Sequence, residues 1–375
     1  MATPTAYQLY RDARFFGSLD GLRCLCIVMV LWHHSPIFAS LEDYPLILGR
    51  GFTGVDFFFV LSGFLITTLL LREYDKTGAI SLRGFYWRRI LRIVPVYFLV
   101  VSIMAFYWIV VKGQTEYLRS LPYYYGFLSN YLRLDIPLLS PTWSLAVEEQ
   151  YYLVWPLLLV LLPGRLQWRL GLAVALVTVL ALVGLGLLPT ITLAPPTDIS
   201  SFELPALSFL ALILGSLLAI LLHTRRGFES LYNVAGHRGA APVFLIGLGA
   251  VLQFTPAHFY SWPSILAYIL MASTIAALVV REDGLLAPLL KWGPVARIGA
   301  ISYGLYLWHT PVRELVILLL EPFGVSRSDD ALLVTVIFVA ASVALAEVSF
   351  RYFESWFLRL KDRRSQPGLV ADRRG

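Results

Sequence analysis

Long apolar segments separated by short polar loops run along this chain of 375 residues. A helix needs about 20 mostly apolar residues to cross the hydrocarbon core of a bilayer. On that criterion the chain is predicted to be an all-α integral membrane protein, a polytopic bundle of about ten transmembrane helices. The ten predicted segments are 22–38, 55–71, 93–111, 143–162, 170–188, 202–222, 241–255, 264–280, 299–320 and 331–350.

The distribution of basic residues predicts the orientation of this bundle. With the N-terminus in the cytoplasm, 24 of the 30 Lys and Arg residues fall on the cytoplasmic side. Cytoplasmic loops of membrane proteins carry such an excess of positive charge, so we expect both termini in the cytoplasm. The strong preference for Arg over Lys is typical of a GC-rich bacterial genome. The expected location is therefore the bacterial inner (cytoplasmic) membrane, as a multi-pass protein.

Composition supports a membrane protein and argues against other classes. Hydrophobic residues make up 58% of the chain and charged residues 14%, whereas soluble domains contain about 45–50% apolar and about 25% charged residues. The net charge of +6 does not indicate a nucleic-acid partner, because the basic residues lie between apolar segments and not on one soluble face. Cys24 and Cys26 fall on different faces of a helix, so we predict neither a local disulfide nor a metal site.

The apolar pattern predicts one domain. Residues 1–357 form the transmembrane domain, and 358–375 form a basic cytoplasmic tail that we expect to be disordered or to lie on the anionic inner leaflet. The longest predicted outer loop, 112–142, is too short for a catalytic ectodomain. Whatever chemistry the chain performs is therefore expected inside the helix bundle.

Two adjacent imidazoles, His33 and His34, stand in the first apolar segment. An ionisable group at bilayer depth is costly and by default marks a functional site, and histidine is suited to move a proton near neutral pH. The helical rise places His34 and Glu148, in the fourth segment, both about 6–8 Å below the outer edge. We therefore expect a base and a carboxylate in one layer. The other interpretation of such an imidazole is a hydrogen bond across helices.

Three further polar residues have a structural interpretation beside a functional one. Asp56, near the outer start of the second segment, is a candidate catalytic carboxylate or a cap of that helix. His309, near mid-depth in the ninth segment, is a candidate site residue or a hydrogen-bonding partner of a neighbouring helix. Ser62, followed by Gly63, lacks the spacing of a hydrolase nucleophile and favours close helix contact.

Three arginines, Arg88, Arg89 and Arg92, gather at the predicted inner end of the third segment. They can anchor the helix at the cytoplasmic face, as the orientation rule requires. Guanidinium groups also bind phosphates through bidentate hydrogen bonds, so the cluster is a candidate phosphate site. The sequence alone leaves both interpretations open.

Several of these motifs resemble one known family. They lie at residues 19–34, 54–66, 80–95, 142–153 and, more sparsely, 301–309. Arg23 is followed by ten residues and then His34, and two residues separate Arg89 from Arg92. In order and spacing the motifs resemble membrane-bound acyltransferase family three, whose members O-acylate carbohydrates and related acceptors. The likeness is dense over residues 1–155, while 165–295 resembles the family only in being apolar and helical.

The resemblance implies a bundle of ten or eleven helices, to which some members attach an ectodomain. Because this chain lacks room for that extension, we expect the stand-alone form. The resemblance also implies a reaction in which an acyl group, most often acetyl, moves from cytoplasmic acyl-CoA to a hydroxyl without a metal. The implied roles are catalytic for His34, Glu148 and Asp56, cofactor-binding for Arg88, Arg89, Arg92 and Arg23, and substrate-binding or supporting for His33, Trp143, Ser144, Ser62 and His309.

Within that reaction, His34 is expected to act as general base, with Glu148 orienting its ring. The alternative is a relay in which His34 itself carries the acyl group. The acceptor is left open between an envelope glycan approached from outside and a glycosylated small molecule approached from inside. A different class of function, a proton-coupled transporter or a flippase of a sugar-linked or lipid-linked substrate, would also use buried imidazoles and carboxylates.

Overall fold

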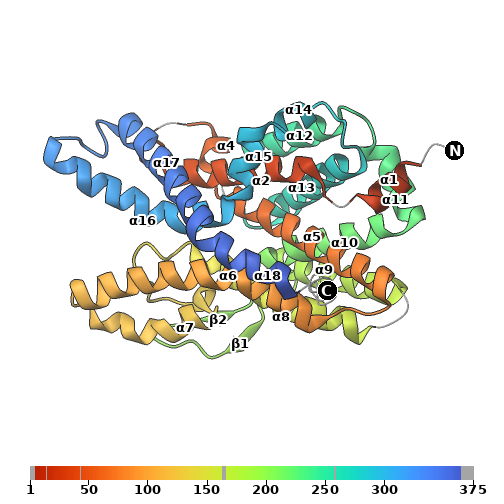
Figure 1. Cartoon of the computed structure of the whole chain (residues 1–375), viewed down its shortest axis with the longest axis horizontal. Helices are drawn as coiled ribbons and strands as arrows, with labels where there is room; N and C mark the ends of the chain where they lie inside the picture. The colour runs from red at the N-terminus through yellow and green to blue at the C-terminus, as the bar shows by residue number, and fades with distance from the viewer. Residues whose placement is uncertain (1–4, 14, 43, 163–165, 257–258, 365–375) are drawn as a thin grey trace, which may run out of the picture.

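Helices make up almost all of the computed structural model, which describes residues 5–13, 15–42, 44–162, 166–256 and 259–364 (Figure 1). A helix lies at each of the ten predicted apolar segments, with shifted ends. These helices are α2 (Gly17–His33), α5 (Thr53–Thr77), α6 (Leu82–Ala105), α8 (Thr142–Leu161), α9 (Leu166–Gly184), α10 (Ala206–His223), α12 (Ala240–Phe254), α13 (Trp262–Val280), α16 (Ser302–Leu320) and α17 (Ala331–Val348). The predicted all-α class is therefore confirmed.

Six helices of the described part are long and apolar enough to cross a membrane, and two bent pairs could raise that number to eight. The bent pairs join α1 (Ala6–Asp12) to α2 at 71° and α11 (Arg225–Ala235) to α12 at 72°. Helices α8 and α16 fall outside this set, because two adjacent glutamates in α8 and an Arg-Glu pair in α16 lower their mean hydropathy. The count of ten spans and the cytoplasmic location of both termini stay predictions.

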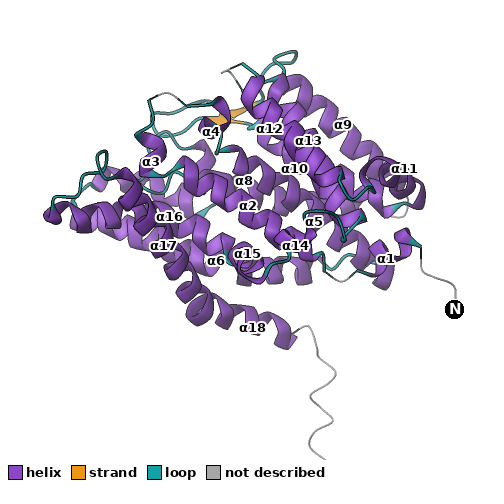
Figure 2. Cartoon of the chain, turned by 90° about the horizontal axis from the view of Figure 1, so that it is seen from above, coloured by secondary structure: helices purple, strands orange, loops and turns teal. Residues whose placement is uncertain are grey.

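Short elements connect the long helices at two opposite edges of the bundle (Figure 2). At one edge lie α3 (Pro36–Ala39), α4 (Leu46–Gly49) and the antiparallel pair of strands β1 (Thr192–Ala194) and β2 (Phe202–Glu203). Near the other edge lie α1, α14 (Ala287–Leu290) and α15 (Gly293–Ala300). The other short elements are α7 (Leu121–Tyr125), 3₁₀ turns at Thr115–Ser120, Ser129–Tyr131 and Glu321–Phe323, and a π-helical turn at Phe106–Val111 that continues α6.

The first predicted segment, 22–38, is not one helix. Helix α2 begins at Gly17 and ends at His33, and α3 begins at Pro36. Proline has no backbone N–H and restricts the residue before it to extended conformations, so the helix stops there. Ser35 then caps α3 by accepting a hydrogen bond from the backbone N–H of Phe38, 3.1 Å away. As a result, His34 lies at the C-terminal end of α2, as its C-cap residue.

Two other predicted boundaries also differ from the structure. The segment 202–222 begins in strand β2, and α10 starts only at Ala206, after Pro205. At the C-terminal end, α17 continues through a π-helical turn (Ser349–Glu354) into α18 (Ser355–Arg364). Helical structure therefore extends past residue 357 into the predicted tail, and the remainder of that tail, 365–375, lies outside the described residues.

Helix α5 is the centre of the bundle. In its most apolar stretch 72% of the residues are buried, against 17% in α9. Hydrogen bonds between side chains join α5 and α10 to α8: the indole N–H of Trp155 donates to the Thr67 hydroxyl at 2.8 Å, and the hydroxyls of Tyr151 and Ser216 lie 2.7 Å apart. Three helices are thus held together by polar contacts inside an apolar core.

Two glycines allow the backbones of α5 and α10 to touch. A methyl group added at Gly63 would meet the carbonyl oxygen of Leu212, and one added at Gly215 would meet the carbonyl oxygen of Val60. Small residues at helix interfaces permit this close approach in membranes. The interpretation of Ser62 and Gly63 as a close helix contact is therefore confirmed at Gly63.

We expect Gly215→Ala to destabilise the protein by about 1–3 kcal/mol, because the added methyl group overpacks the contact with α5. The measurement is thermal unfolding of the purified protein in detergent. Gly171→Ala is the matched control, since Gly171 lies inside α9 with no heavy atom within 4 Å of the added methyl position. Equal unfolding temperatures for the two variants would contradict the backbone contact.

Candidate active site

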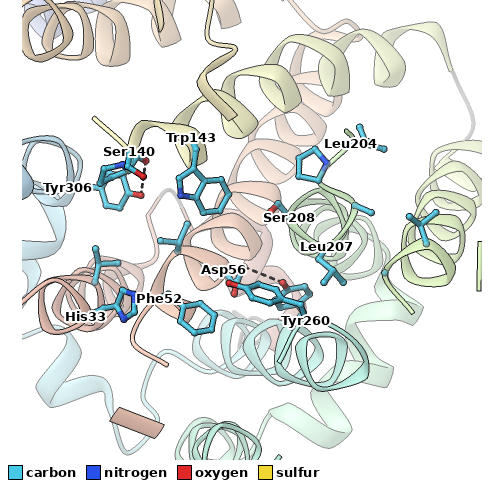
Figure 3. A pocket seen from close by; sticks show the side chains of 18 of the residues that line it. His33, Phe52, Asp56, Ser140, Trp143, Leu204, Leu207, Ser208, Tyr260 and Tyr306 are labelled. Carbon is cyan, nitrogen blue, oxygen red and sulfur yellow. Dashed lines mark hydrogen bonds between the residues drawn. The ribbon is translucent and has the colours of Figure 1, made fainter. Parts of the chain in front are cut away.

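A cavity of about 460 Å³ opens between α2, α5, α8, α13 and α16, with the end of α9 and the start of α10 completing its lining. Its volume lies in the range of about 300–1,000 Å³ that is usual for small-molecule sites. Figure 3 shows His33, Asp56, Trp143 and Tyr306 arranged around it. The aromatic and ionisable residues of the lining are His33, His34, Phe52, Asp56, Trp143, Tyr260, Tyr268 and Tyr306.

The ring of His34 is held in one orientation by the end of its own helix. Its Nδ1 lies 3.0 Å from the carbonyl oxygen of Val30, and since a carbonyl can only accept, Nδ1 carries the proton. The other ring nitrogen, Nε2, then has a free lone pair and can accept a proton. Arg313 donates a hydrogen bond to the carbonyl of His34 at 3.2 Å. Both His34 and His33 reach the cavity, with ring planes at 85°.

A third imidazole, His309, lies beside His34. The ring centroids are 4.8 Å apart. The Nδ1 of His309 lies 2.6 Å from the carbonyl oxygen of Tyr306, so it too is the donor, and its buried Nε2 has no hydrogen-bond partner among the described residues. His309 therefore packs against the ring of His34 but does not itself line the cavity. The Tyr306 hydroxyl is in turn held 2.7 Å from that of Ser144.

Asp56 lies in the cavity wall and does not cap its helix. The N-cap position of α5 is Phe52, without a side-chain capping bond, so Asp56 falls in the first helical turn on the buried face. Its Oδ1 accepts a hydrogen bond from the Tyr268 hydroxyl at 3.2 Å. The capping interpretation is therefore wrong, and a catalytic role for Asp56 stays a prediction.

Glu148 does not lie against His34, and the expected layer of base and carboxylate is wrong. The Glu148 carboxylate accepts a hydrogen bond from the Ser62 hydroxyl at 2.7 Å. Ser62 follows Asp56 by six residues along α5, which separates the two by about 9 Å. The depth estimate assumed regular spans, whereas α2 ends at His33 and α8 starts with its Trp143 at the cavity. Glu148 belongs to a second polar layer.

Arginines from α6 share that second layer. The guanidinium carbon of Arg89 lies 4.2 Å from the ring centroid of Tyr152 in α8. Arg89 is also near enough to Glu148 and Glu149 to interact electrostatically with both. Arg92 is exposed and makes no ion pair in the part of the chain that the structure describes. The Arg92 guanidinium interacts electrostatically with Arg89 and Arg23 and with the carboxylates of Asp20 and Glu354.

The other two predicted cofactor-binding arginines have carboxylate partners of their own. Arg88 donates to Glu73 at 3.3 Å, and Arg23 forms an ion pair with Asp20 one turn earlier in α2. The four arginines are therefore not equivalent, because only Arg89 and Arg92 lack a salt bridge within 4 Å among the described residues. The described residues contain no group of three or more His, Cys, Asp or Glu that could hold a metal ion.

The structure adds residues to the cavity that the sequence did not indicate. Phe52, Tyr260 and Tyr268 line it, but aromatic residues at the ends of apolar segments are too common to single out. Arg313 does not line the cavity but donates a hydrogen bond to the carbonyl of His34. It is an ionisable group inside the apolar segment 299–320, so it meets the criterion that selects His34 in the sequence.

The different burial of the two imidazoles can be tested with cysteines. We expect His34→Cys, in a background with Cys24 and Cys26 replaced by Ala, to react with a water-soluble maleimide. His309→Cys should react at least about ten-fold more slowly, because thiol reactivity requires access and the His309 side chain is fully buried. Labelling after denaturation is the control for total thiol. Equal rates in the folded protein would contradict the placement of the cavity.

The residues of the cavity and of the second polar layer lie in a stretch of sequence that is similar to known proteins. The family described as "Acyltransferase domain" matches residues 16–347. Peptidoglycan O-acetyltransferase OatA of Listeria monocytogenes is 28% identical over 370 residues, covering 91% of this chain and 56% of that relative. O-acetyltransferase OatA of Staphylococcus aureus is 29% identical over 364 residues, with 91% and 57% covered. YrhL of Bacillus subtilis is 30% identical over 376 residues, with 93% and 56% covered.

The chain spans little more than half the length of these relatives. No solved structure matches it. The family match, in contrast, extends over most of the chain and includes the cavity, the two polar layers and α16. The protein is therefore a member of the family defined by that domain, acyltransferase family three.

Proposed function

We propose that this protein is a membrane O-acyltransferase that moves an acetyl group from cytoplasmic acyl-CoA to a hydroxyl of a carbohydrate or glycosylated acceptor. The observation that carries the proposal is His34 in the lining of an open cavity, with Nδ1 hydrogen-bonded to Val30 and Nε2 able to accept a proton, in a member of an acyltransferase family. The relatives named for peptidoglycan O-acetylation favour a carbohydrate of the cell envelope as acceptor. Family membership also favours an enzyme over the transporter or flippase considered above.

His34 is the general base of the proposed reaction. The acceptor hydroxyl gives its proton to Nε2 while its oxygen bonds to the carbonyl carbon of the thioester. The carbon–sulfur bond then breaks, and the proton passes from His34 to the CoA sulfur as the thiol leaves. The hydrogen bond from Nδ1 to Val30 fixes the tautomer that this step needs. His309 packs behind the ring, and Asp56 faces the same cavity.

Arg89 and Arg92 bind the phosphates of the donor in this proposal, with Arg88 and Arg23 supporting the positive potential. Phosphates prefer guanidinium partners that can form two parallel hydrogen bonds. The extended arm of CoA separates its thioester from its phosphates, which suits two layers at different depths. Glu148, which is bonded to Ser62 and near Arg89, would hold the arginine in place and not orient His34.

The proposed orientation puts the arginine layer toward the cytoplasm and the cavity toward the outer face of a bacterial inner membrane. The excess of basic residues in the predicted inner loops supports it. An acceptor entering from outside and a donor entering from inside would then meet within the bundle. Both termini lie in the cytoplasm in this arrangement.

We expect His34→Ala to lower acetyl transfer at least about 100-fold, because a positioned general base contributes that much or more. The assay follows label from acetyl-CoA into glycan in membranes or detergent. His237→Ala is the control, since His237 is exposed and distant from the cavity lining. Unchanged turnover in a folded His34→Ala variant would remove His34 from the reaction. A label trapped on His34 would instead support the acyl-histidine relay.

Arg89→Ala should raise the KM for acetyl-CoA about ten-fold or more, with a much smaller effect on the KM for the acceptor, because a charge-assisted contact to phosphate is lost. Arg83→Ala is the matched control at the start of the same helix, where the arginine is exposed. A similar rise in both KM values would indicate that Arg89 stabilises only the bundle.

A further inference from the structure

Among the residues that the structure describes, one acid and no arginine or lysine line the cavity. Among the twenty lining residues Asp56 is the single carboxylate, and there is no Arg or Lys. His33 and His34 are the other ionisable groups with a basic nitrogen. Anionic ligands are normally bound by arginine, lysine or a helix N-terminus. Helices α5, α8 and α10 begin at the cavity, and the first turn of α5 carries the Asp56 carboxylate. The side chains of the wall, with one carboxylate and no arginine or lysine among the described residues, therefore disfavour an anionic occupant.

Two arginines beside residues of the cavity wall, Arg50 and Arg313, donate hydrogen bonds to backbone carbonyls. Arg50 donates hydrogen bonds to the carbonyls of Leu252, Thr255 and Pro256 and to the Thr255 hydroxyl, and it is only 4% exposed. Arg313 donates to the carbonyl of His34. Neither lines the cavity. Both cations thus hold helix ends and leave the charge of Asp56 without a salt bridge among the described residues.

Asp56 has hydrogen-bonding capacity left for an occupant. Its Oδ1 accepts from Tyr268, while Oδ2 has no partner in the described part of the chain. An ionised carboxylate accepts several hydrogen bonds, and leaving a buried one short of partners is costly. A hydroxyl or an ammonium group of a ligand would meet this requirement, whereas a ligand carboxylate or phosphate would be repelled.

The remaining walls suit a ring that is apolar on its face and polar on its edge. Trp143 and Phe52 point toward the cavity in Figure 3, and Tyr260 and Tyr306 add further aromatic surface. Aromatic side chains combine a large apolar face with defined geometry. A pyranose ring has C–H groups on its face and hydroxyls at its edge, so it fits both the aromatic walls and Asp56.

We propose that the cavity binds the acceptor as a sugar unit without an anionic substituent, with a hydroxyl or ammonium group donating to Asp56. This inference rests on the proposed function, because it takes the cavity to be the acceptor site. It narrows the acceptor to neutral or amino sugars. Sugar phosphates and uronic acids are excluded at the ring that receives the acyl group.

The experiment compares four ligands that share one ring. Methyl β-glucoside, methyl β-glucosaminide, methyl β-glucuronide and glucose 6-phosphate are titrated into the full-length protein in detergent. Binding is followed by the fluorescence of Trp143, with Trp143→Phe as the control for signal from other tryptophans. Acetyl transfer from labelled acetyl-CoA to each sugar is measured in parallel. We expect the glucoside and the glucosaminide to bind at least about ten-fold more tightly than the two anions.

A variant of Asp56 isolates the cause of this selectivity. Asp56→Asn keeps the shape and one acceptor oxygen but removes the charge, so the preference for the uncharged glucoside over the glucuronide should fall by about ten-fold. The preference for the glucosaminide over the glucoside, if carried by its ammonium group, should disappear as well. Asp198→Asn is the matched control, because Asp198 is exposed on an outer loop and pairs with Arg119.

The outcomes separate this inference from the proposed function. Equal affinity for neutral and anionic sugars, or no binding of any of the four, would overturn the inference even if acetyl transfer to cell-wall polymer occurs. Selectivity that survives Asp56→Asn would overturn the role of Asp56. Selective binding without any transfer from acetyl-CoA would support the inference and contradict the proposed function.

Discussion

The close contact between α5 and α10 is the constraint on which the rest of the structure depends. Gly63 and Gly215 let the two backbones touch, and α5 then presents Asp56 to the cavity and Ser62 to Glu148. In a bilayer, helices gain little from hydrophobic contact with each other, so close packing and hydrogen bonds drive their association. The same helix therefore fixes both polar layers, and neither layer could move without the other.

Two arginines, Arg50 and Arg313, bind backbone carbonyls at helix ends near the cavity, and this use of their charge affects the electrostatics of the cavity. Helix ends leave carbonyl groups without partners inside the helix, and in an apolar environment such groups must be satisfied by the protein. Arg50 serves the end of α12 and Arg313 serves the end of α2. Because these cations bind backbone carbonyls, neither of them lines the cavity, where Asp56 is the one carboxylate among the described lining residues. Arg89 and Arg92, which form no salt bridge within 4 Å among the described residues, lie in the second layer.

Hydropathy located the helices well, because the membrane requires about 20 apolar residues wherever a helix crosses it. It failed where local stereochemistry intervened, at Pro36 and at Pro205, since a hydropathy average does not register a missing N–H. The depth of a residue in the membrane, calculated from regular helices, also did not predict which side chains contact each other. The estimate set Glu148 beside His34, but the interruption of the first segment and the start of α8 at the cavity put Ser62 beside Glu148 instead.

By itself, the sequence determined the all-α class, the family and most of the polar residues that matter, because ionisable groups in apolar segments are rare and their motifs keep fixed spacings. Only the tertiary structure decided which of them meet. His34 pairs with His309, Asp56 with Tyr268 and Glu148 with Ser62, across 86 residues for the last pair and 212 for Asp56 and Tyr268. Such contacts depend on the rotation and axial shift of whole helices, which backbone packing at a few small residues sets and which no local pattern records.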